Sequence, residues 1–333
     1  MANKITAWNE RKAILLKDKC KPYIKRLNKV IAEVATTKER ANVYWSKLQA
    51  EVKKIYRGVQ KVCKDWTNIF IPIGFRAAAR QSIYKIKNNS ITRTKKIKAL
   101  DTIILPNDFN YTTFINKDIV KQATQSLTEE TLTAFVTGLL SGEKLIIKLL
   151  RNTQQINIKE YQINEAIKNG YIEKGTIQES IKQLQRQLLS AATEGKYITI
   201  INKNGAEMHF QIDTYAELVA RTKLQEASAQ AVLNTASVAG SDLVQVSAHN
   251  TPTKICIPFE GKIFSITGNN KDFPKLSESP PYHPNCLHTL TVVFEEGLQA
   301  DDTYDKYSAF SKGETGQHPT RKGWIPVSQR TIK

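Results

Sequence analysis

Long amphipathic helices are the feature that most constrains this fold, and they begin near the N-terminus. Between residues 5 and 66 there is no glycine before Gly58 and a single proline, Pro22. Apolar residues recur three and four positions apart, which places them on one face of an α-helix. We therefore expect one long helix over 5–66, with basic residues on its other face. Its apolar face would hold Ile24, Leu27, Val30, Ile31, Val34, Ala41, Trp45, Leu48, Val52 and Ile55.

The helical pattern is interrupted at IFIPIGF, residues 69–75, where Pro72 and Gly74 predict a buried turn. A further helical segment, a polar basic linker at 87–100 and a second helical region from 117 to about 196 follow. In that second region, the spacing of a serine or threonine three positions before a glutamate predicts two helix starts with capping boxes. The two pairs are Ser126 with Glu129 and Thr176 with Glu179.

Patterns typical of β-strands begin only after residue 196. Two β-rich runs within 197–212 flank Asn204-Gly205, which favours a tight hairpin turn. Asp213 is expected to open a helix that ends at Gly240. Three strand-like runs follow, at 242–249, 256–267 and 287–296.

These patterns predict an α+β protein with a mostly α-helical N-terminal two thirds and a small C-terminal α+β domain. We divide the chain into a basic long-helix region at 1–104 and a helical domain at 105–196. An α+β domain with a Cys/His motif would cover 197–300, and a polar extended tail 301–333.

Positive charge is concentrated in the first third of the chain. Residues 1–100 hold 25 Lys and Arg against 6 Asp and Glu, although the net charge of the whole chain is only +18. Such asymmetry predicts a module that faces nucleic acid, an anionic membrane or an acidic protein surface. The alternative is a basic helix surface that is simply solvated.

Two further features exclude classes of protein. No apolar run approaches the roughly 20 residues that span a bilayer, and charges interrupt the first 19 residues, so we expect no membrane partner and no secretory signal. Four scattered cysteines do not suggest a disulfide framework, which favours a reducing compartment.

The clearest chemical signal is PPYHPNCLHT, residues 280–289, in a chain with only five histidines and four cysteines. Zinc prefers thiolate and imidazole ligands in a tetrahedron. Side chains two positions apart along a strand point to the same side, so the cysteine and the second histidine of this stretch could share a ligand site. The predicted zinc ligands are Cys256, His283, Cys286 and either His288 or His249.

Three other interpretations of these residues stay open. Cys286 or Cys256 could be a nucleophile paired with a histidine. His249-Asn250 with Asn285 could belong to a nuclease of the HNH type, although no helix with a second metal ligand follows the motif. The residues could also be unrelated to one another.

The segment from 197 to 296 resembles phage minor head (minor capsid) proteins of the Mu-type head morphogenesis group. In that family a helix with an Arg-Thr pair precedes a Cys-containing strand, an acidic-Gly-Lys turn and a His-Pro-Asn-Cys loop. The matching residues here are Arg221-Thr222, Cys256, Glu260-Gly261-Lys262 and His283-Pro284-Asn285-Cys286. The family often has Cys-x-x-Cys where this chain has Thr253-x-x-Cys256. Either His249 or His288 then replaces a thiolate, or the motif is held by packing without a metal.

The resemblance implies a structural, non-enzymatic component of the virion, inside the capsid or at the portal vertex, with the host cytoplasm as its site of assembly. Its expected partners are the portal protein, the major capsid protein and packaged double-stranded DNA, which the basic N-terminal region would contact without sequence specificity. It would assist head assembly, DNA packaging or genome delivery. The alternatives are a metal-dependent nuclease or toxin-type enzyme that uses the His/Cys cluster, and a DNA-binding protein that acts outside the virion.

Overall fold

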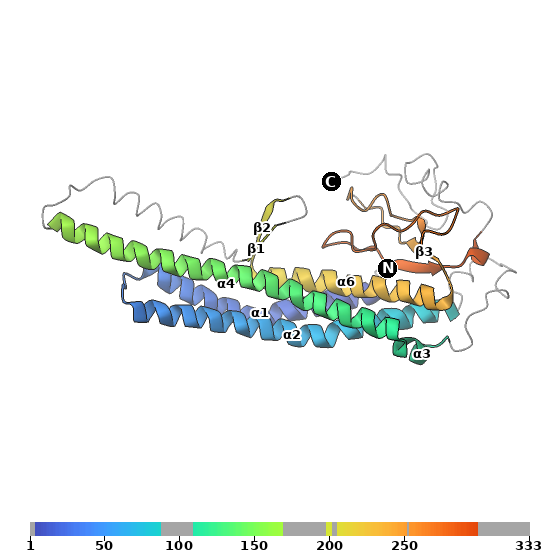
Figure 1. Ribbon diagram of the computed structural model, residues 1–333, viewed down its shortest axis with the longest axis horizontal. Coiled ribbons are helices and arrows are strands. Elements are labelled where there is room, and N and C mark those ends of the chain that lie inside the picture. Colours follow the sequence, from blue (N-terminus) through green and yellow to red (C-terminus); the bar gives the residue numbers. More distant parts are fainter. Residues whose placement is uncertain (1–3, 88–108, 169–197, 202–204, 252, 299–333) are drawn as a thin grey trace. The chain divides into compact units, whose positions relative to one another are not determined.

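The computed structural model describes residues 4–87, 109–168, 198–201, 205–251 and 253–298 (Figure 1). Long helices form most of this part of the chain and short antiparallel strands follow them, so the predicted α+β class is confirmed. The helices are α1 (Lys4–Thr36), α2 (Asn42–Lys87), α3 (Tyr111–Asn116), α4 (Asp118–Lys168) and α6 (Ile212–Ala239). The strands are β1 (Ile198–Ile201), β2 (Glu207–Phe210), β3 (Leu243–Val246), β4 (Ile263–Ser265) and β5 (Leu290–Val293), before the 3-10 turn η2 (Glu295–Gly297).

The described residues group into two compact units, each assembled from separate stretches of chain. The first unit takes its described residues from within 1–12, 68–130 and 220–333, and the second from within 13–67 and 131–219. The four-segment division expected from composition stays a prediction about the linear organisation of the chain. None of the described helices combines the length and the apolar character needed to cross a bilayer.

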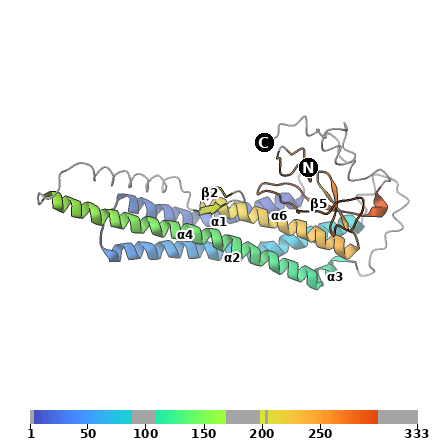
Figure 2. The same cartoon turned by 45° about the horizontal axis from the view of Figure 1, so that its top comes forward.

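The single helix predicted over 5–66 is wrong, because two helices replace it. Figures 1 and 2 show α1 and α2 lying side by side, and residues 37–41 connect them. The Oε1 atom of Glu39 accepts hydrogen bonds from the backbone N–H groups of Arg40 (2.8 Å) and Ala41 (3.0 Å). The side-chain amide of Asn157, from α4, donates to the carbonyl oxygens of Thr37 and Glu39, both at 3.1 Å. A tertiary contact therefore satisfies the backbone groups that the break exposes.

The turn predicted at 69–75 is also wrong, because α2 continues through Pro72 to Lys87. A proline inside a helix costs about 3 kcal/mol, but Ile71 and Phe75 are fully buried on either side of it. Gly74 lets the helix approach its neighbours closely. A Cβ atom there would lie 2.9 Å from Cδ2 of Leu224 in α6. Burial of apolar side chains thus outweighs the local preference for a break.

The capping box predicted at Ser126 and Glu129 is wrong as well, since α4 begins earlier, at Asp118. The Ser126 hydroxyl, inside the helix, donates to Oε1 of Glu130 at 2.9 Å. A cap forms instead at Asn110, whose Oδ1 accepts from the backbone N–H of Thr113 at 3.0 Å and starts α3. The linker at 87–100, the capping box at Thr176 and Glu179, and the tail from 301 lie outside the described residues, apart from residue 87, which ends α2.

The hairpin and the later helix agree with their sequence patterns. β1 pairs antiparallel with β2, with Ile198 opposite Phe210, so the two β-rich runs pair as predicted. Asn204 of the predicted turn lies outside the described residues. Helix α6 ends at Ala239, and Gly240 follows with a φ of 79°. The backbone N–H of Ser241 then bonds to the carbonyl of Ala236 at 2.9 Å, which closes a glycine C-cap.

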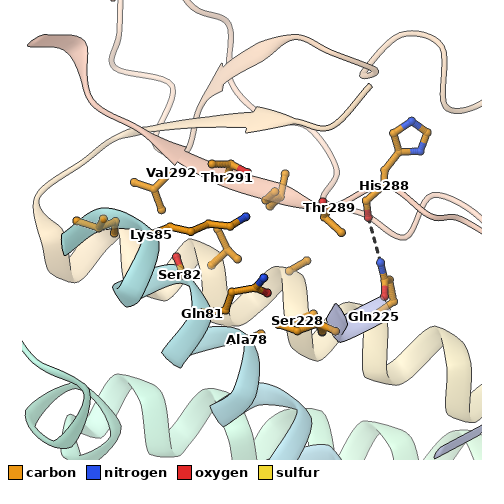
Figure 3. Close-up of a pocket in the computed structure, with 15 residues that line it drawn as sticks. Ala78, Gln81, Ser82, Lys85, Gln225, Ser228, His288, Thr289, Thr291 and Val292 are labelled. Carbon is orange, nitrogen blue, oxygen red and sulfur yellow. Dashed lines mark hydrogen bonds between the residues drawn. The ribbon is translucent and has the colours of Figure 1, made fainter. Parts of the chain in front are cut away.

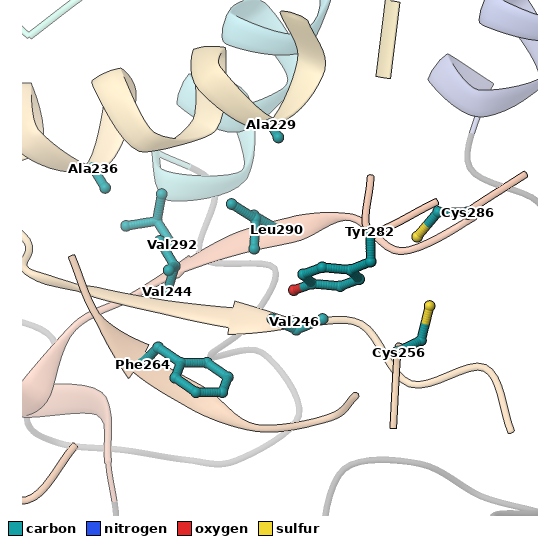
Figure 4. Close-up of a cluster of buried hydrophobic side chains, with 10 residues drawn as sticks. All are labelled: Ala229, Ala236, Val244, Val246, Cys256, Phe264, Tyr282, Cys286, Leu290 and Val292. Carbon is teal, nitrogen blue, oxygen red and sulfur yellow. The ribbon is translucent and has the colours of Figure 1, made fainter. Parts of the chain in front are cut away.

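A small sheet with the strand order β4-β3-β5 packs on α6 in the first unit. All pairs are antiparallel, with Val244 of β3 opposite Phe264 on one side and Val292 on the other. The strands are shorter than predicted, and Cys256 lies in a turn at 254–261 that precedes β4. Figure 4 shows the core that results. Its buried members are Ala229, Ala236, Val244, Val246, Cys256, Phe264, Tyr282, Cys286, Leu290 and Val292.

Candidate metal centre

Two cysteines and one histidine meet at the edge of this core. Cys256, Cys286 and His288 are at most 5% exposed, and their ligand atoms all lie within 4.8 Å of one another. The Sγ atom of Cys286 is 3.4 Å from Nδ1 of His288. Figure 4 shows the two sulfur atoms pointing toward each other from separate segments of chain. The fold thus brings together three of the five side chains that the sequence singled out.

Local hydrogen bonds place the two cysteines. The backbone N–H of Cys256 bonds to the carbonyl of Thr253 at 3.0 Å, and its own carbonyl accepts from the N–H groups of Phe259 and Glu260, both at 3.1 Å. The N–H of Cys286 bonds to the carbonyl of His283 at 2.9 Å. Both thiols therefore stand on tight turns whose backbone groups are satisfied.

His288 reaches the cysteines through an extended stretch that leads into β5. Leu287 is 51% exposed whereas the residues on either side are buried, so the predicted alternation of side chains holds although β5 itself begins only at Leu290. The side-chain amide of Gln225, in α6, donates to the carbonyl oxygen of His288 at 3.2 Å. This contact fixes the backbone of His288 against the long helix.

Glu260 faces the far side of the imidazole and was not among the predicted site residues. Its Oε1 lies 3.6 Å from Nε2 of His288, and the side chains are 1% and 3% exposed. The Nε2 atom is itself buried and makes no hydrogen bond in the described part of the chain. The one sequence signal for this residue was its place in the Glu260-Gly261-Lys262 turn. Its role is apparent only in the structure, because a buried glutamate needs a partner.

The protonation states of these groups are coupled. Burial by itself lowers the pKa of His288, but the neighbouring side chains of Cys256, Cys286 and Glu260 outweigh burial and raise it to about 11. Burial raises the pKa of the Cys286 thiol, yet hydrogen bonding from His288 and from the backbone leaves it below its usual value. Burial raises the pKa of Cys256. Hydrogen bonding between Cys286 and His288 therefore shifts both groups toward their charged forms, and the side chain of Glu260 faces the other nitrogen of the imidazole.

The two other predicted histidines lie outside this cluster of ligand atoms. His249 is exposed, its Nε2 is 2.7 Å from Oγ of Ser247, and its ring meets that of His288 edge-on with 5.0 Å between centroids. His283 is half-buried on the turn that carries Cys286. Burial, with a smaller contribution from His288, lowers the pKa of His283, which favours the neutral imidazole.

Two kinds of chemistry fit this arrangement to different degrees. Two thiols and an imidazole are typical zinc ligands, and a buried site is typical of structural zinc. Cys286, His288 and Glu260 also follow the order nucleophile, base and carboxylate of a catalytic triad. However, all three are at most 5% exposed, so a substrate has no direct approach to the sulfur. Cys256 has no role in a catalytic triad, whereas in a metal site it supplies the third ligand.

The HNH interpretation receives no support from the environment of Asn285. This side chain is engaged with α6, where its Oδ1 accepts a hydrogen bond from Nη1 of Arg221 at 2.9 Å. After β5 the described chain continues as the 3-10 turn η2, not as the helix that a ββα metal site needs.

A pocket lies behind the metal cluster in the same unit, between α2, α6 and β5 (Figure 3). Its cavity volume is about 40 Å³, and it is partly open to solvent. Lys85 enters it from α2, beside Ser82 and opposite Thr291, and burial lowers the pKa of its ammonium group. Gln225 joins the pocket to the cluster through its bond to the carbonyl of His288.

Comparison with known proteins finds one family. A family model described as phage minor capsid protein 2 matches residues 98–315, which is more than half of the chain and includes every ligand of the candidate metal centre. No curated protein and no solved structure matches the chain.

Proposed function

The chain belongs to the phage minor capsid protein 2 family, and from this premise we propose that it is a structural component inside the phage head, associated with the portal vertex. Family membership confirms the predicted phage minor capsid protein and makes the chain part of the virion, among other head components. Assignment to the Mu-type group stays a prediction. The interior position, the portal and the major capsid protein as neighbours, and a role in assembly, packaging or genome delivery are parts of the proposal.

The proposal includes contact between the basic N-terminal third and packaged DNA or an acidic portal surface. A stripe on α2, here called the basic stripe, supports it: Arg57, Lys61 and Lys64 are exposed at spacings of four and three. Those spacings place the three cations on one helix face. No ion pair involves them among the described residues. Unpaired cations in a row suit a phosphate backbone, which is bound without regard to sequence.

The proposal also assigns zinc a structural role, with Cys256, Cys286 and His288 as ligands. The observation that carries it is their convergence, fully buried, from two loops about 30 positions apart in the chain. A metal ion there would join the turn before β4 to the segment before β5. Such a staple suits a sheet of three short strands, because a small core supplies little stability by itself.

The cellular role is tested by co-expression with the portal and major capsid proteins, followed by isolation of heads. The chain should co-purify with heads in low copy number and be lost from them when the portal is omitted. Normal heads that form without it, while the chain stays free, would contradict the proposal. DNA cleavage that is lost on replacing His249 or His288 would instead favour the nuclease alternative.

The DNA contact has a matched control within the same unit. The triple variant R57Q/K61Q/K64Q removes the basic stripe, and K144Q/K148Q/R151Q removes one arginine and two lysines that are also exposed at spacings of four and three, on α4. Loss of three phosphate contacts should weaken DNA binding and reduce the slope of log K against log salt by about 2 to 3. Equal effects of the two triple variants would mean that only net charge matters and that the basic stripe is not a DNA-binding surface.

A further inference from the structure

We propose that Glu260 positions His288: its carboxylate faces Nε2 of the imidazole, so that Nδ1 is the nitrogen that binds the metal. The same carboxylate holds the backbone of residues 249–251. This inference rests on the zinc site proposed above. It adds a fourth functional residue and specifies which nitrogen of His288 is the ligand.

The orientation of the imidazole is the first argument. Nδ1 of His288 faces Sγ of Cys286 at 3.4 Å, and Nε2 faces Oε1 of Glu260 at 3.6 Å. A metal bound between the two sulfur atoms therefore meets Nδ1. The proton of the neutral imidazole must then be on Nε2, where Glu260 is the acceptor that faces it. Carboxylate partners of this kind fix the tautomer and the ring orientation of metal-bound histidines.

The remaining contacts of Glu260 are the second argument. Its Oε1 accepts hydrogen bonds from the backbone N–H groups of His249 and of Thr251, the latter at 3.2 Å, and its Oε2 lies 3.3 Å from the same N–H of Thr251. Between these residues Asn250 has a φ of 56°, in the left-handed region that non-glycine residues rarely adopt. One carboxylate thus holds a less favourable backbone turn and faces the ligand imidazole.

Burial explains why the side chain of this residue needs hydrogen-bond partners. Glu260 is 2% exposed, and a buried carboxylate persists only where donors surround it. Backbone N–H groups and the Nε2–H of a metal-bound imidazole are such donors. A glutamine offers one acceptor oxygen and an NH2 group, so it cannot satisfy the same set of donors. Occupancy of the metal site and the conformation of the 249–251 backbone are therefore linked through Glu260.

The first test compares E260Q with wild type and with E296Q in the full-length protein. Glu296 is exposed in the same unit, so E296Q removes one charge at a distance from the site. Metal affinity is measured with Zn²⁺ in competition with a chromophoric chelator, and the ligand set with Co²⁺ by the thiolate-to-cobalt absorption band. We expect E260Q to bind zinc 10- to 100-fold more weakly, with one metal per chain and the thiolate band retained, and E296Q to match wild type.

The second test uses wild-type protein and does not depend on the folding of a variant. Long-range ¹H–¹⁵N correlation of the His288 ring in the zinc-loaded protein identifies its tautomer. The expected result is a protonated Nε2 and a metal-bound Nδ1. Metal on Nε2, or E260Q binding zinc as tightly as wild type, would overturn the role of Glu260 and leave the zinc site intact. Wild-type protein that binds no zinc or cobalt would refute the zinc site itself.

Discussion

Arg221 of α6 donates a hydrogen bond from Nη1 to Oδ1 of Asn285, 2.9 Å away and 64 positions later in the chain. The contact joins the Arg-Thr helix to the His-Pro-Asn-Cys loop, the two segments on which the resemblance to minor head proteins was based. Gln225, one helical turn further along α6, holds the carbonyl of His288. The long helix therefore holds both ends of the Cys286–His288 segment.

Replacing Arg221 by alanine should loosen this loop. We expect faster amide hydrogen exchange at residues 283–286 and unchanged zinc stoichiometry, because the metal ligands themselves are kept. K223A is the control, since Lys223 pairs with Glu226 and Glu130 instead of the loop. If K223A accelerated exchange at 283–286 as much as R221A, the effect would be a general one of α6 and the contact with Asn285 would be unimportant.

Removing the metal or a thiolate ligand should destabilise the first unit. C256S, C286S and chelator-treated wild type are each expected to have a melting temperature at least about 5 °C lower than that of untreated wild type. In a domain of this size, a loss of 1 kcal/mol in the free energy of unfolding lowers the melting temperature by about 2–4 °C. Calorimetry with and without chelator measures this. C20S is the control: Cys20 is equally buried but belongs to the second unit, so its zinc content should equal that of wild type. Zinc-free wild-type protein with silent C256S and C286S would refute the staple.

The fourth ligand can be assigned by two histidine variants. We expect H283A to weaken zinc binding at least 10-fold, because His283 is half-buried, lies on the same turn as Cys286, and has a lowered pKa that favours the neutral imidazole a metal needs. H249A should bind zinc within about threefold of wild type, since its Nε2 is engaged with Ser247. Chelator competition on both variants decides between them, and the reverse order would make His249 the ligand.

An alanine at Gly58 should be destabilising, although alanine normally stabilises a helix interior by about 0.5–1 kcal/mol relative to glycine. A Cβ atom at Gly58 would lie 2.1 Å from Cε1 of Tyr23 in α1. We expect G58A to lower the free energy of unfolding by about 1–3 kcal/mol through overpacking. Urea denaturation of G58A, Y23A and the double variant forms the test. In the Y23A background, G58A should become neutral or stabilising, and a persistent loss there would exclude Tyr23 as the cause.

Asp242 should contribute stability that depends on pH. Burial raises the pKa of this carboxyl, but hydrogen bonds from Ser265, Thr267 and Ile266 together outweigh burial and lower it below 3.8. A lowered native pKa stabilises the fold above the unfolded pKa and loses that contribution as pH falls through the native value. D242N should therefore cost about 1 kcal/mol at pH 7. The difference from wild type should shrink below about pH 4; a cost that is constant with pH would mean that ionisation is irrelevant.

Local sequence was sufficient wherever a preference is decided within a few residues. The helical periodicity, the antiparallel pairing of the two β-rich runs and the glycine C-cap at Gly240 all agree with the structure, because each depends on backbone conformations and neighbours a few positions away. The Cys and His residues could be recognised as candidates for the same reason: their chemistry and close spacing are properties of the chain itself.

Tertiary structure decided the features that local preference predicted wrongly or left open. The break at 37–41 is secured by Asn157, more than a hundred positions away, and α2 continues through Pro72 because its flanking side chains are buried. Likewise, Cys256, Cys286 and His288 converge while His249 does not, and Glu260 joins them. Spacing along the sequence does not specify which loops meet. That depends on how α6 and the β4-β3-β5 sheet bury their apolar faces against each other, which is a property of the whole packed unit.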